Sequence, residues 1–131
     1  MNLQQSFKRW KSEDDCILFL EKIKWGTSPC CPYCKSIKNT AVPKENRYHC
    51  NTCLTSFSVT TKTLFHKTKV DLRKWLVAIN VVTNADKITA RKLAEELQVT
   101  KDTALFISKR IKKEFLEQSS FLHQILKSHE Q

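Results

Sequence analysis

The sequence predicts a mainly α-helical protein with a small cysteine-rich β ribbon near its N-terminus. Two Cys-x-x-Cys pairs, separated by fifteen residues, indicate the ribbon, because each pair forms a tight knuckle and the residues between them form a hairpin. Apolar residues at helical spacing indicate helices before and after it. We therefore expect an N-terminal helix and the ribbon in residues 1–65, and a helical domain with a helix-turn-helix in residues 66–131.

The first helix is expected over residues 12–24. Ser12 followed by Asp15 forms a capping box, and the acidic residues of this turn suit the positive end of the helix dipole. The buried face is predicted to consist of Cys16, Phe19, Leu20 and Ile23. Cys16 is then a core residue, with a further metal ligand as the alternative interpretation.

The two cysteine pairs predict one bound Zn²⁺. Its ligands are expected to be Cys31, Cys34, Cys50 and Cys53. Four thiolates close the tetrahedral shell of Zn²⁺ and leave no position for a substrate, so the metal is expected to be structural. Disulfides are the alternative, but they need an oxidising compartment, and residues 1–15 contain no apolar core of signal-peptide type.

Two residues beside the pairs are alternative metal ligands. Cys30 precedes Cys31 directly, but the two-residue gap and the proline of the knuckle select Cys31. Cys30 remains a potential substitute if Cys31 is mutated. His49 is a weaker alternative ligand, and we interpret it as an ordinary hairpin residue.

Short strands are expected within the ribbon, and a helix is expected after it. Residues 47–49 and 56–60 carry the aromatic and β-branched side chains typical of strands. A second helix is predicted over residues 71–83. Its buried side chains are expected to be Leu72, Trp75, Leu76, Ile79 and Val82.

Residues 88–113 indicate two helices separated by a turn. Thr89 and Thr100 are the expected N-caps, with a hydrophobic staple at each. Gln98 stands in the turn where a left-handed backbone is required, at a cost of about 1 kcal/mol for a residue other than glycine. This is helix-turn-helix geometry, and a plain helical hairpin with a charged outer face is the alternative.

The second of these helices is the candidate reader of a DNA major groove. Its candidate DNA-binding residues are Lys101, Asp102, Thr103, Phe106, Lys109, Arg110, Lys112 and Lys113. The pattern also places Ser108 on this outer face. Lys101 and Thr103 lie in the first turn, where side chains reach base edges, whereas the later basic residues are expected to meet phosphates.

Composition favours an anionic partner. The formal net charge is +10, and the basic residues are spread over both halves of the chain. Nucleic acid is the commonest partner of a basic zinc protein, although a merely basic surface is the alternative. The single glycine, Gly26, argues against a phosphate-binding glycine loop. No apolar run is long enough to span a membrane, and we expect a cytoplasmic, nucleoid-associated protein.

A last helix is expected after Ser119 or Ser120, either of which would cap it. Its apolar stripe consists of Phe121, Leu122, Ile125 and Leu126. This stripe either folds back on the helical core or meets a partner chain, and the sequence does not choose between the two.

From about Phe7 to Phe115 the order of these parts resembles the N-terminal region of bacterial zinc-ribbon insertion-sequence transposases, the relatives of the Merlin elements. The resemblance rests on the acidic-capped helix ending at Trp25, the two knuckles, the Phe57 strand, Thr61, Thr63 and Phe65, the Thr68-Lys69 pair, Leu72 with Trp75, and the helix-turn-helix running into Arg110-Ile111. Two glycines of the family are replaced here by Lys35 and Lys62, where its backbone makes close approaches.

The resemblance implies a DNA-binding function without catalysis. In that family a catalytic domain with acidic metal-binding residues follows, whereas Glu95, Glu96 and Asp102 fall here on short helices with no strand to hold two Mg²⁺ ions. We expect a sequence-specific module for transposon ends, not an enzyme, with Zn²⁺ as cofactor and double-stranded DNA as partner. The alternatives are a fragment of an active DDE transposase, or a partner or inhibitor that contacts a full-length enzyme, or a second copy, through the C-terminal helix.

Overall fold

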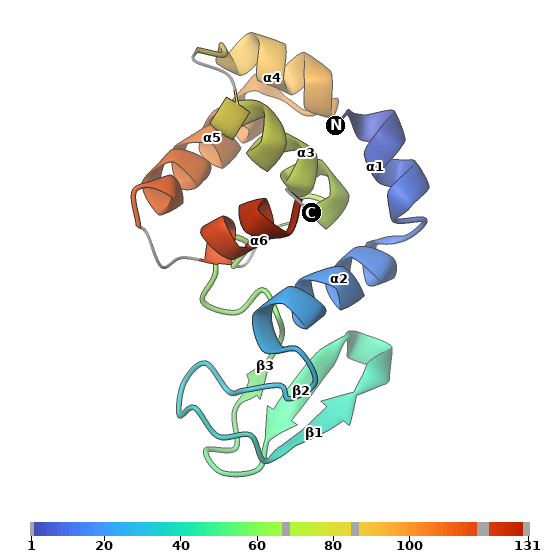
Figure 1. Ribbon diagram of the computed structural model, residues 1–131, viewed down its shortest axis with the longest axis vertical. Helices are drawn as coiled ribbons and strands as arrows, with labels where there is room; N and C mark the ends of the chain where they lie inside the picture. The colour runs from blue at the N-terminus through green and yellow to red at the C-terminus, as the bar shows by residue number, and fades with distance from the viewer. Residues whose placement is uncertain (1, 67–68, 85–86, 118–120, 130–131) are drawn as a thin grey trace.

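The computed structural model describes residues 2–66, 69–84, 87–117 and 121–129. Within these ranges the chain forms six α-helices and one three-stranded antiparallel sheet. Figure 1 shows the helices gathered into one body, with the ribbon beyond α2. The predicted fold class, mainly α with a small β ribbon, is confirmed. None of the helices in the described ranges is long and apolar enough to cross a membrane.

Two helices precede the ribbon. α1 (Leu3–Arg9) begins at a capping box in which the side chain of Asn2 and that of Gln5 each accept a bond from the other's backbone amide. The sequence analysis did not predict α1, so the helix expected over residues 12–24 is the second and not the first. That helix is α2 (Glu13–Trp25), and its predicted cap is confirmed because the Ser12 hydroxyl accepts from the Asp15 amide.

The ribbon is a small meander. β1 (Asn39–Val42) pairs with β2 (Arg47–Cys50), and β2 pairs with β3 (Ser56–Phe57), both antiparallel. A 3₁₀ turn, η1 (Pro43–Glu45), connects the first two strands. The strand expected over residues 56–60 is shorter than predicted. Its pairing ends at Phe57 because the Ser58 amide donates to the Thr61 hydroxyl and the Thr61 amide returns to the Ser58 carbonyl, which turns the chain.

Three helices follow the ribbon. α3 (Leu72–Asn84) is followed by α4 (Ala90–Leu97) and α5 (Lys101–Phe115). Both predicted caps are confirmed, because the hydroxyls of Thr89 and Thr100 accept from amides in the first turns of α4 and α5. Gln98 ends α4 in the left-handed conformation that the sequence required, with φ 54° and ψ 50°.

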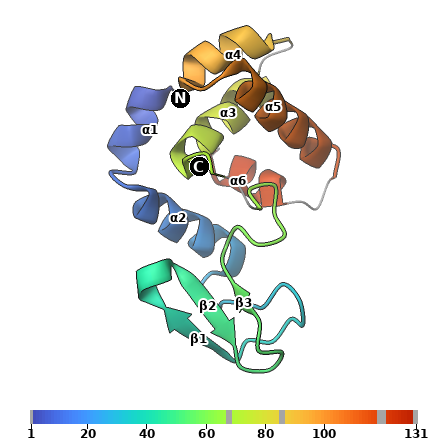
Figure 2. The same cartoon turned by 180° about the vertical axis from the view of Figure 1, so that it is seen from behind.

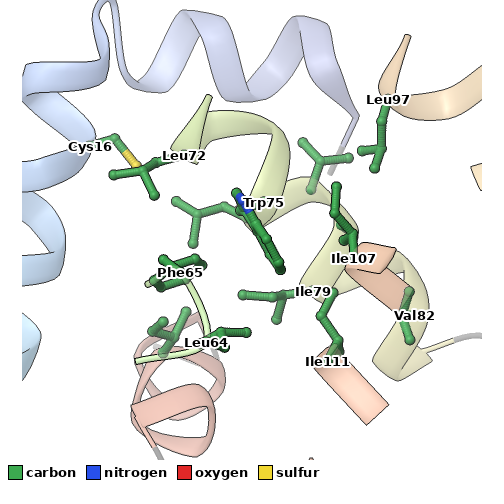
Figure 3. Packing of buried hydrophobic residues seen from close by; sticks show 14 of the residues in the cluster. Cys16, Leu64, Phe65, Leu72, Trp75, Ile79, Val82, Leu97, Ile107 and Ile111 are labelled. Carbon is green, nitrogen blue, oxygen red and sulfur yellow. The ribbon is translucent and has the colours of Figure 1, made fainter. Parts of the chain in front are cut away.

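The main hydrophobic core lies between the helices, with α3 in contact with α1, α2, α4 and α5. Trp75 is fully buried, and Figure 3 shows it among side chains from several elements, with Phe65 on one side and Ile107 on the other. The rings of Phe65 and Trp75 meet edge to face at 5.3 Å. Cys16 is fully buried in this core, and burial raises the pKa of its thiol to about 12, so its predicted role as a core residue is confirmed.

The C-terminal helix, α6 (Phe121–His129), folds back on the body. Leu122 and Ile125 are fully buried, and α6 contacts α2 and α5. The apolar stripe therefore packs into the chain's own core. Of the two alternatives that the sequence left open, the structure shows the helix folded back on the helical body. The expected cap at Ser119 or Ser120 lies outside the described residues, as does Thr68.

Packing crosses the boundary expected between residues 65 and 66. α1, its C-cap residue Trp10 and α2 contribute to the same core as α3, α4 and α5, through Leu3, Trp10, Cys16 and Leu20. A second, much smaller cluster lies inside the ribbon and consists of Cys31, Cys50 and Phe57, with Trp25 and Tyr48 packed against it. The division into residues 1–65 and 66–131 stays a prediction, whereas the two clusters divide the chain into a ribbon and a single helical body.

Candidate metal centre and nucleic-acid interface

The four cysteines predicted to bind Zn²⁺ lie together at one end of the ribbon. Their sulfur atoms all lie within 4.8 Å of one another. The Sγ atoms of Cys31 and Cys53 are 3.7 Å apart, and those of Cys34 and Cys50 are 3.5 Å apart. A tetrahedral site with Zn–S bonds of about 2.3 Å requires sulfurs about 3.8 Å apart. The cluster therefore fits a four-coordinate zinc ion with little adjustment.

The two knuckles have the same backbone hydrogen bonds. The Lys35 amide donates to the Cys31 carbonyl, and the Leu54 amide donates to the Cys50 carbonyl, each at 2.9 Å. Each knuckle then places its next residue in the left-handed region, with φ 67° at Lys35 and 63° at Leu54. Lys35 is one of the two positions where the family resemblance implies a glycine. A glycine there would adopt this conformation without strain, whereas lysine adopts it at a cost.

Backbone amides also prepare the metal ligands. The Cys53 amide donates to the Cys50 sulfur at 3.5 Å. This bond and one from Thr52, acting against burial, lower the pKa of the Cys50 thiol to about 6. The thiolate is the form that binds metal, so these amides favour at Cys50 the charge state that Zn²⁺ needs. At Cys34 a backbone amide bond at Ser36 acts to lower the pKa, but burial and the neighbouring thiols outweigh it and raise the pKa to about 12. With the ion bound, the site's role is structural, since four sulfurs complete its coordination.

Three aromatic rings support the centre from the helical side. Trp25 meets Tyr48 and Phe57 edge to face at 5.5 and 5.8 Å, and the Tyr48 and Phe57 rings stack. His49 lies on β2 and is not part of the sulfur cluster, and neither is Cys30, whose thiol donates to the Lys35 carbonyl instead.

Comparison with known proteins agrees with this geometry. Residues 11–56 match the family model described as the transposase zinc-ribbon domain. The predicted resemblance to zinc-ribbon transposases is confirmed. A protein of Halobacterium salinarum, described as an uncharacterized protein in transposable element ISH50, is 29% identical over 99 residues, which make up 73% of this chain. The match spans 33% of that relative, about a third of its length. No solved structure matches the chain.

The helical body presents α4 and the N-terminal end of α5 at the end away from this transposase-like ribbon, as Figure 2 shows for α4. Six of the eight predicted DNA-binding residues are exposed on α5, namely Lys101, Asp102, Phe106, Lys109, Lys112 and Lys113. Thr103 is half-buried, and its hydroxyl bonds that of Thr100 at 2.8 Å. Ser108, predicted on the outer face, is buried instead. It continues the apolar stripe of Ala104, Ile107 and Ile111 at helical spacing, so it faces the core.

Phe106 is a large apolar side chain held in an exposed place. It is 46% exposed, yet its ring meets that of Trp75 edge to face at 6.5 Å and carries the Arg110 guanidinium at 4.9 Å. An anchored aromatic ring on a polar helix face is suited to apolar contact with a thymine methyl group.

Arg110 makes contacts that the sequence analysis missed. One of its terminal nitrogens donates to the carbonyls of Leu64 and His66, at 2.8 and 3.2 Å. It thereby ties α5 to the segment that leads from the ribbon into α3. The basic side chain looked like a phosphate contact because the sequence alone cannot show carbonyls 44 and 46 residues away. Its expected contact with phosphate stays a prediction.

Proposed function

We propose that the chain is a sequence-specific DNA-binding module that acts at transposon ends. The observation that carries the proposal is the pair α4 and α5, two capped helices joined by a three-residue turn, with a polar exposed first turn on α5. The transposase-type ribbon and the net charge of +10 support it. The proposal implies a cytoplasmic protein associated with the nucleoid.

The α4 and α5 pair has the features of a helix-turn-helix. Ala94 and Ala104 are small, buried residues of the two helices, and Leu97 and Ile107 fill the space between the helices and α3. The Lys74 ammonium of α3 donates to the Gln98 carbonyl at 3.3 Å, which fixes the turn. Such a rigid unit is suited to insert the N-terminal end of α5 into a major groove.

Base readout is assigned to the first turns of α5 and phosphate contact to its later turns. Lys101, Asp102, Thr103 and Phe106 lie on the turns that reach base edges. Lys109, Lys112 and Lys113 are exposed further along and are suited to phosphates. Arg110 can also contact a phosphate, but only through the guanidinium donors that its bonds to the Leu64 and His66 carbonyls leave available.

The chain is proposed to act without strand cleavage. Among the described residues, the one cluster of side chains that fits a metal ion is the four-cysteine centre, whose ligand set leaves no open position. Glu95, Glu96 and Asp102 are exposed on α4 and α5. Mg²⁺- or Mn²⁺-dependent nicking of plasmid DNA by the purified chain would contradict this part of the proposal.

A second candidate function is a partner, or a part, of an active transposase. The relative in ISH50 favours it, because the matched stretch is only a third of that protein. The burial of Leu122 and Ile125 argues against one version of it, pairing through the apolar stripe of α6. Co-purification of the chain with a full-length zinc-ribbon transposase, in the absence of DNA, distinguishes this candidate from the first.

Selection of bound duplexes from a random pool tests the proposed function. The zinc-loaded chain is expected to enrich one motif. Thr103→Val or Phe106→Ala should relax the preference at one base pair by roughly 1–3 kcal/mol. Lys109→Ala should weaken binding to all sequences alike and lower the salt slope by about one unit. Chelation of zinc should weaken binding without changing the motif, because α4 and α5 pack on the apolar core.

An exposed lysine of the ribbon provides the control for these substitutions. Lys44→Ala, remote from α5 on η1, should leave the motif unchanged. If Lys101→Ala, Thr103→Val and Phe106→Ala all enrich the wild-type motif with undiminished preference in folded, zinc-loaded protein, α5 is scaffold and the ribbon becomes the DNA reader.

A further inference from the structure

A groove lies where the ribbon meets the helical body. It has a volume of about 570 Å³, and we call it the junction groove. Three lysines line it, each from a different segment: Lys24 at the end of α2, Lys35 after the first knuckle, and Lys62 in the loop after β3. The aromatic rings of Trp25 and Phe121 form part of its wall. Three separate parts of the chain thus each contribute a lysine to the lining of one hollow.

The junction groove continues onto α5. A smaller hollow of about 220 Å³ is lined by Arg110, Lys113 and Glu114 of α5 together with Thr63 and Leu64. Thr63 and Glu114 line both hollows, so the two are adjacent. The basic residues of the later turns of α5 and those of the ribbon therefore line two adjacent hollows.

Among the described residues, no ion pair joins a lysine of the groove to a carboxylate. Across the part of the chain that the structure describes, the one ion pair joins Asp71 and Arg73, which do not line the groove. Lys62 instead lies over the Tyr33 ring at 4.7 Å, and Lys24 lies over the Phe121 ring at 5.5 Å. Burial and then the charge of Lys35 lower the pKa of Lys24, as expected of cations held near one another.

Two negative features lie at the edges of these hollows. Glu114 and Glu117 line the wall of the groove on the α5 side. Four thiolates with one Zn²⁺ leave a formal charge of about −2 at the knuckles, which offsets part of the charge of Lys35. Lys24 and Lys62 still line the hollow from α2 and from the loop after β3. A nucleic-acid backbone carries a phosphate at every nucleotide, so it can offer an anion to each of several separated lysines.

We propose that the junction groove holds the phosphate backbone of duplex DNA beyond the base pairs that α5 reads. The inference rests on the proposed function in taking double-stranded DNA as the partner. Lys35 and Lys62 are the principal phosphate contacts, and the rings that carry Lys62 and Lys24 keep the ammonium groups oriented. One DNA molecule thus contacts both halves of the chain, the helix-turn-helix through its bases and the groove through its flank.

Salt titration of binding to duplexes of two lengths tests this inference. Two variants of the full zinc-loaded chain are compared. The groove variant is Lys35→Gln/Lys62→Gln. The matched control is Lys38→Gln/Lys44→Gln, which changes two exposed ribbon lysines outside the groove. On a labelled mixed-sequence duplex of about 30 bp, the groove variant should reduce the slope of log K against log salt by about 2, since each phosphate contact contributes about 0.9. The control should keep the wild-type slope.

A shorter duplex sharpens the test. On a duplex of about 12 bp centred on the motif that α5 selects, the flank is absent, so the groove variant and the wild type should bind with equal slopes. Lys35→Arg/Lys62→Arg should restore the full slope on the longer duplex, because it restores the charge. Equal zinc content and circular dichroism of all variants establish that the fold is retained, and the single Lys62→Gln replaces the double variant if folding suffers.

The outcomes separate this inference from the proposed function. The groove assignment is overturned if the groove and control variants lower the slope equally, or if only binding to a single strand of the same length responds to the groove variant. The reading by α5 is tested independently by the motif that Thr103→Val enriches. If that motif is unchanged while the groove variant still lowers the slope, the proposed reading fails and the groove remains a DNA contact.

Discussion

The ribbon and the helical body are stabilised by different means. Inside the ribbon the fully buried cluster consists of two metal-ligand cysteines and Phe57. The helical body buries a continuous apolar core that extends from Leu3 in α1 to Ile125 in α6. A few buried side chains cannot offset the conformational entropy of ordering the ribbon, so metal coordination must contribute the missing free energy. The helical body has enough apolar burial to fold without it.

The two regions also differ in backbone strain. Five residues other than glycine adopt positive φ in the described chain, and four of them, Lys35, Asn46, Leu54 and Lys62, lie in the ribbon or the loop that leaves it. The helical body has one, Gln98. Tight knuckles need such conformations, and the coordination energy of the metal outweighs their cost. The contrast gives an order of expected effects, with metal loss as the largest and relief of a single strained residue as the smallest.

Removing the metal should unfold the ribbon and leave the helical body intact. Apparent zinc-binding free energies of small zinc domains are about 10–16 kcal/mol at neutral pH, and the ribbon has little else to hold it. Chelation, or the variant Cys31→Ser/Cys53→Ser, should collapse the amide NMR signals of residues 27–58 while those of α3 to α5 keep their dispersion. Cys30→Ser, a change next to a ligand, should retain one zinc per chain. Stoichiometric tetrahedral zinc in the double variant would falsify the ligand assignment.

Truncating the largest fully buried side chain should destabilise the helical body and leave the ribbon able to bind zinc. Trp75→Ala should lower the free energy of unfolding of the helical body by about 3–5 kcal/mol, through lost burial and a cavity. Chemical denaturation followed by far-ultraviolet circular dichroism measures the change. The ribbon of this variant should still bind one zinc, because its ligands and its small cluster lie apart from Trp75. Loss of zinc together with the helices would show that the two regions fold as one unit.

Much of this comparison could be predicted from local patterns. The knuckles, the caps at Thr89 and Thr100, and the stripe of α3 each depend on spacing within one segment, and the structure confirms them. The gathering of the four cysteines was predictable for the same reason, whereas their binding of zinc stays a prediction. The assignment of base and phosphate contacts on α5 stays a prediction.

The features that were missed depend on distant partners. In α1, the buried residues include Ser6, whose hydroxyl donates to the Arg73 carbonyl, 67 residues away, so the helix lacks a purely apolar stripe. β1 is an edge strand that contains Asn39 and Ala41, residue types that are depleted in strands. The role of Arg110 depends on carbonyls of the loop that leaves the ribbon. Each requires knowledge of tertiary packing that periodicity does not contain.

Arg110 ties α5 to the loop that leaves the ribbon, and replacing it should weaken the body moderately. Arg110→Gln removes charge-assisted hydrogen bonds to the Leu64 and His66 carbonyls and should cost about 1.5–3 kcal/mol of stability. Lys109→Gln, the exposed neighbour, should change stability by less than about 0.5 kcal/mol. Thermal unfolding of the two variants measures this difference. Equal stability would mean that the loop is held by other contacts, and that Arg110 is available to phosphate.

The ion pair of the helical body should make its stability depend on acid pH. Burial acts to raise the pKa of Asp71, but the hydrogen bonds and charge of Arg73, at 2.8 Å, outweigh it and lower the pKa. A lowered carboxyl pKa adds stability above the unfolded value of about 4, and this stability is lost as the pH falls through the folded value. Asp71→Asn should therefore cost about 1–2 kcal/mol at pH 7, and the cost should shrink as the pH falls through the folded pKa.

The carboxyl of Glu13 also contributes to the pH dependence of stability, so the measurement uses variants that lack it. Burial and then the charge of Asp71 raise the pKa of Glu13, so its contribution grows as the pH falls, opposite in sign to that of Asp71. The comparison is therefore Glu13→Gln against Glu13→Gln/Asp71→Asn, each denatured at a series of pH values. A difference that stays constant from pH 7 to pH 2 would show that Asp71 acts through packing and not through its charge.

The smallest effect concerns the one strained residue of the helical body. Gln98 adopts φ 54° to end α4, a conformation that costs L-residues about 1 kcal/mol and glycine almost nothing. Gln98→Gly should raise the free energy of unfolding by up to about 1 kcal/mol, because the bond from Lys74 reaches the backbone carbonyl and survives the change. Gln124→Gly, an exposed position within α6, should lower it by about the same amount, because glycine costs about 1 kcal/mol inside a helix. Opposite signs for the same substitution would show that backbone conformation at the turn, and not loss of the glutamine side chain, determines the result, whereas two destabilised variants would mean that Gln98 contributes contacts that exceed its strain.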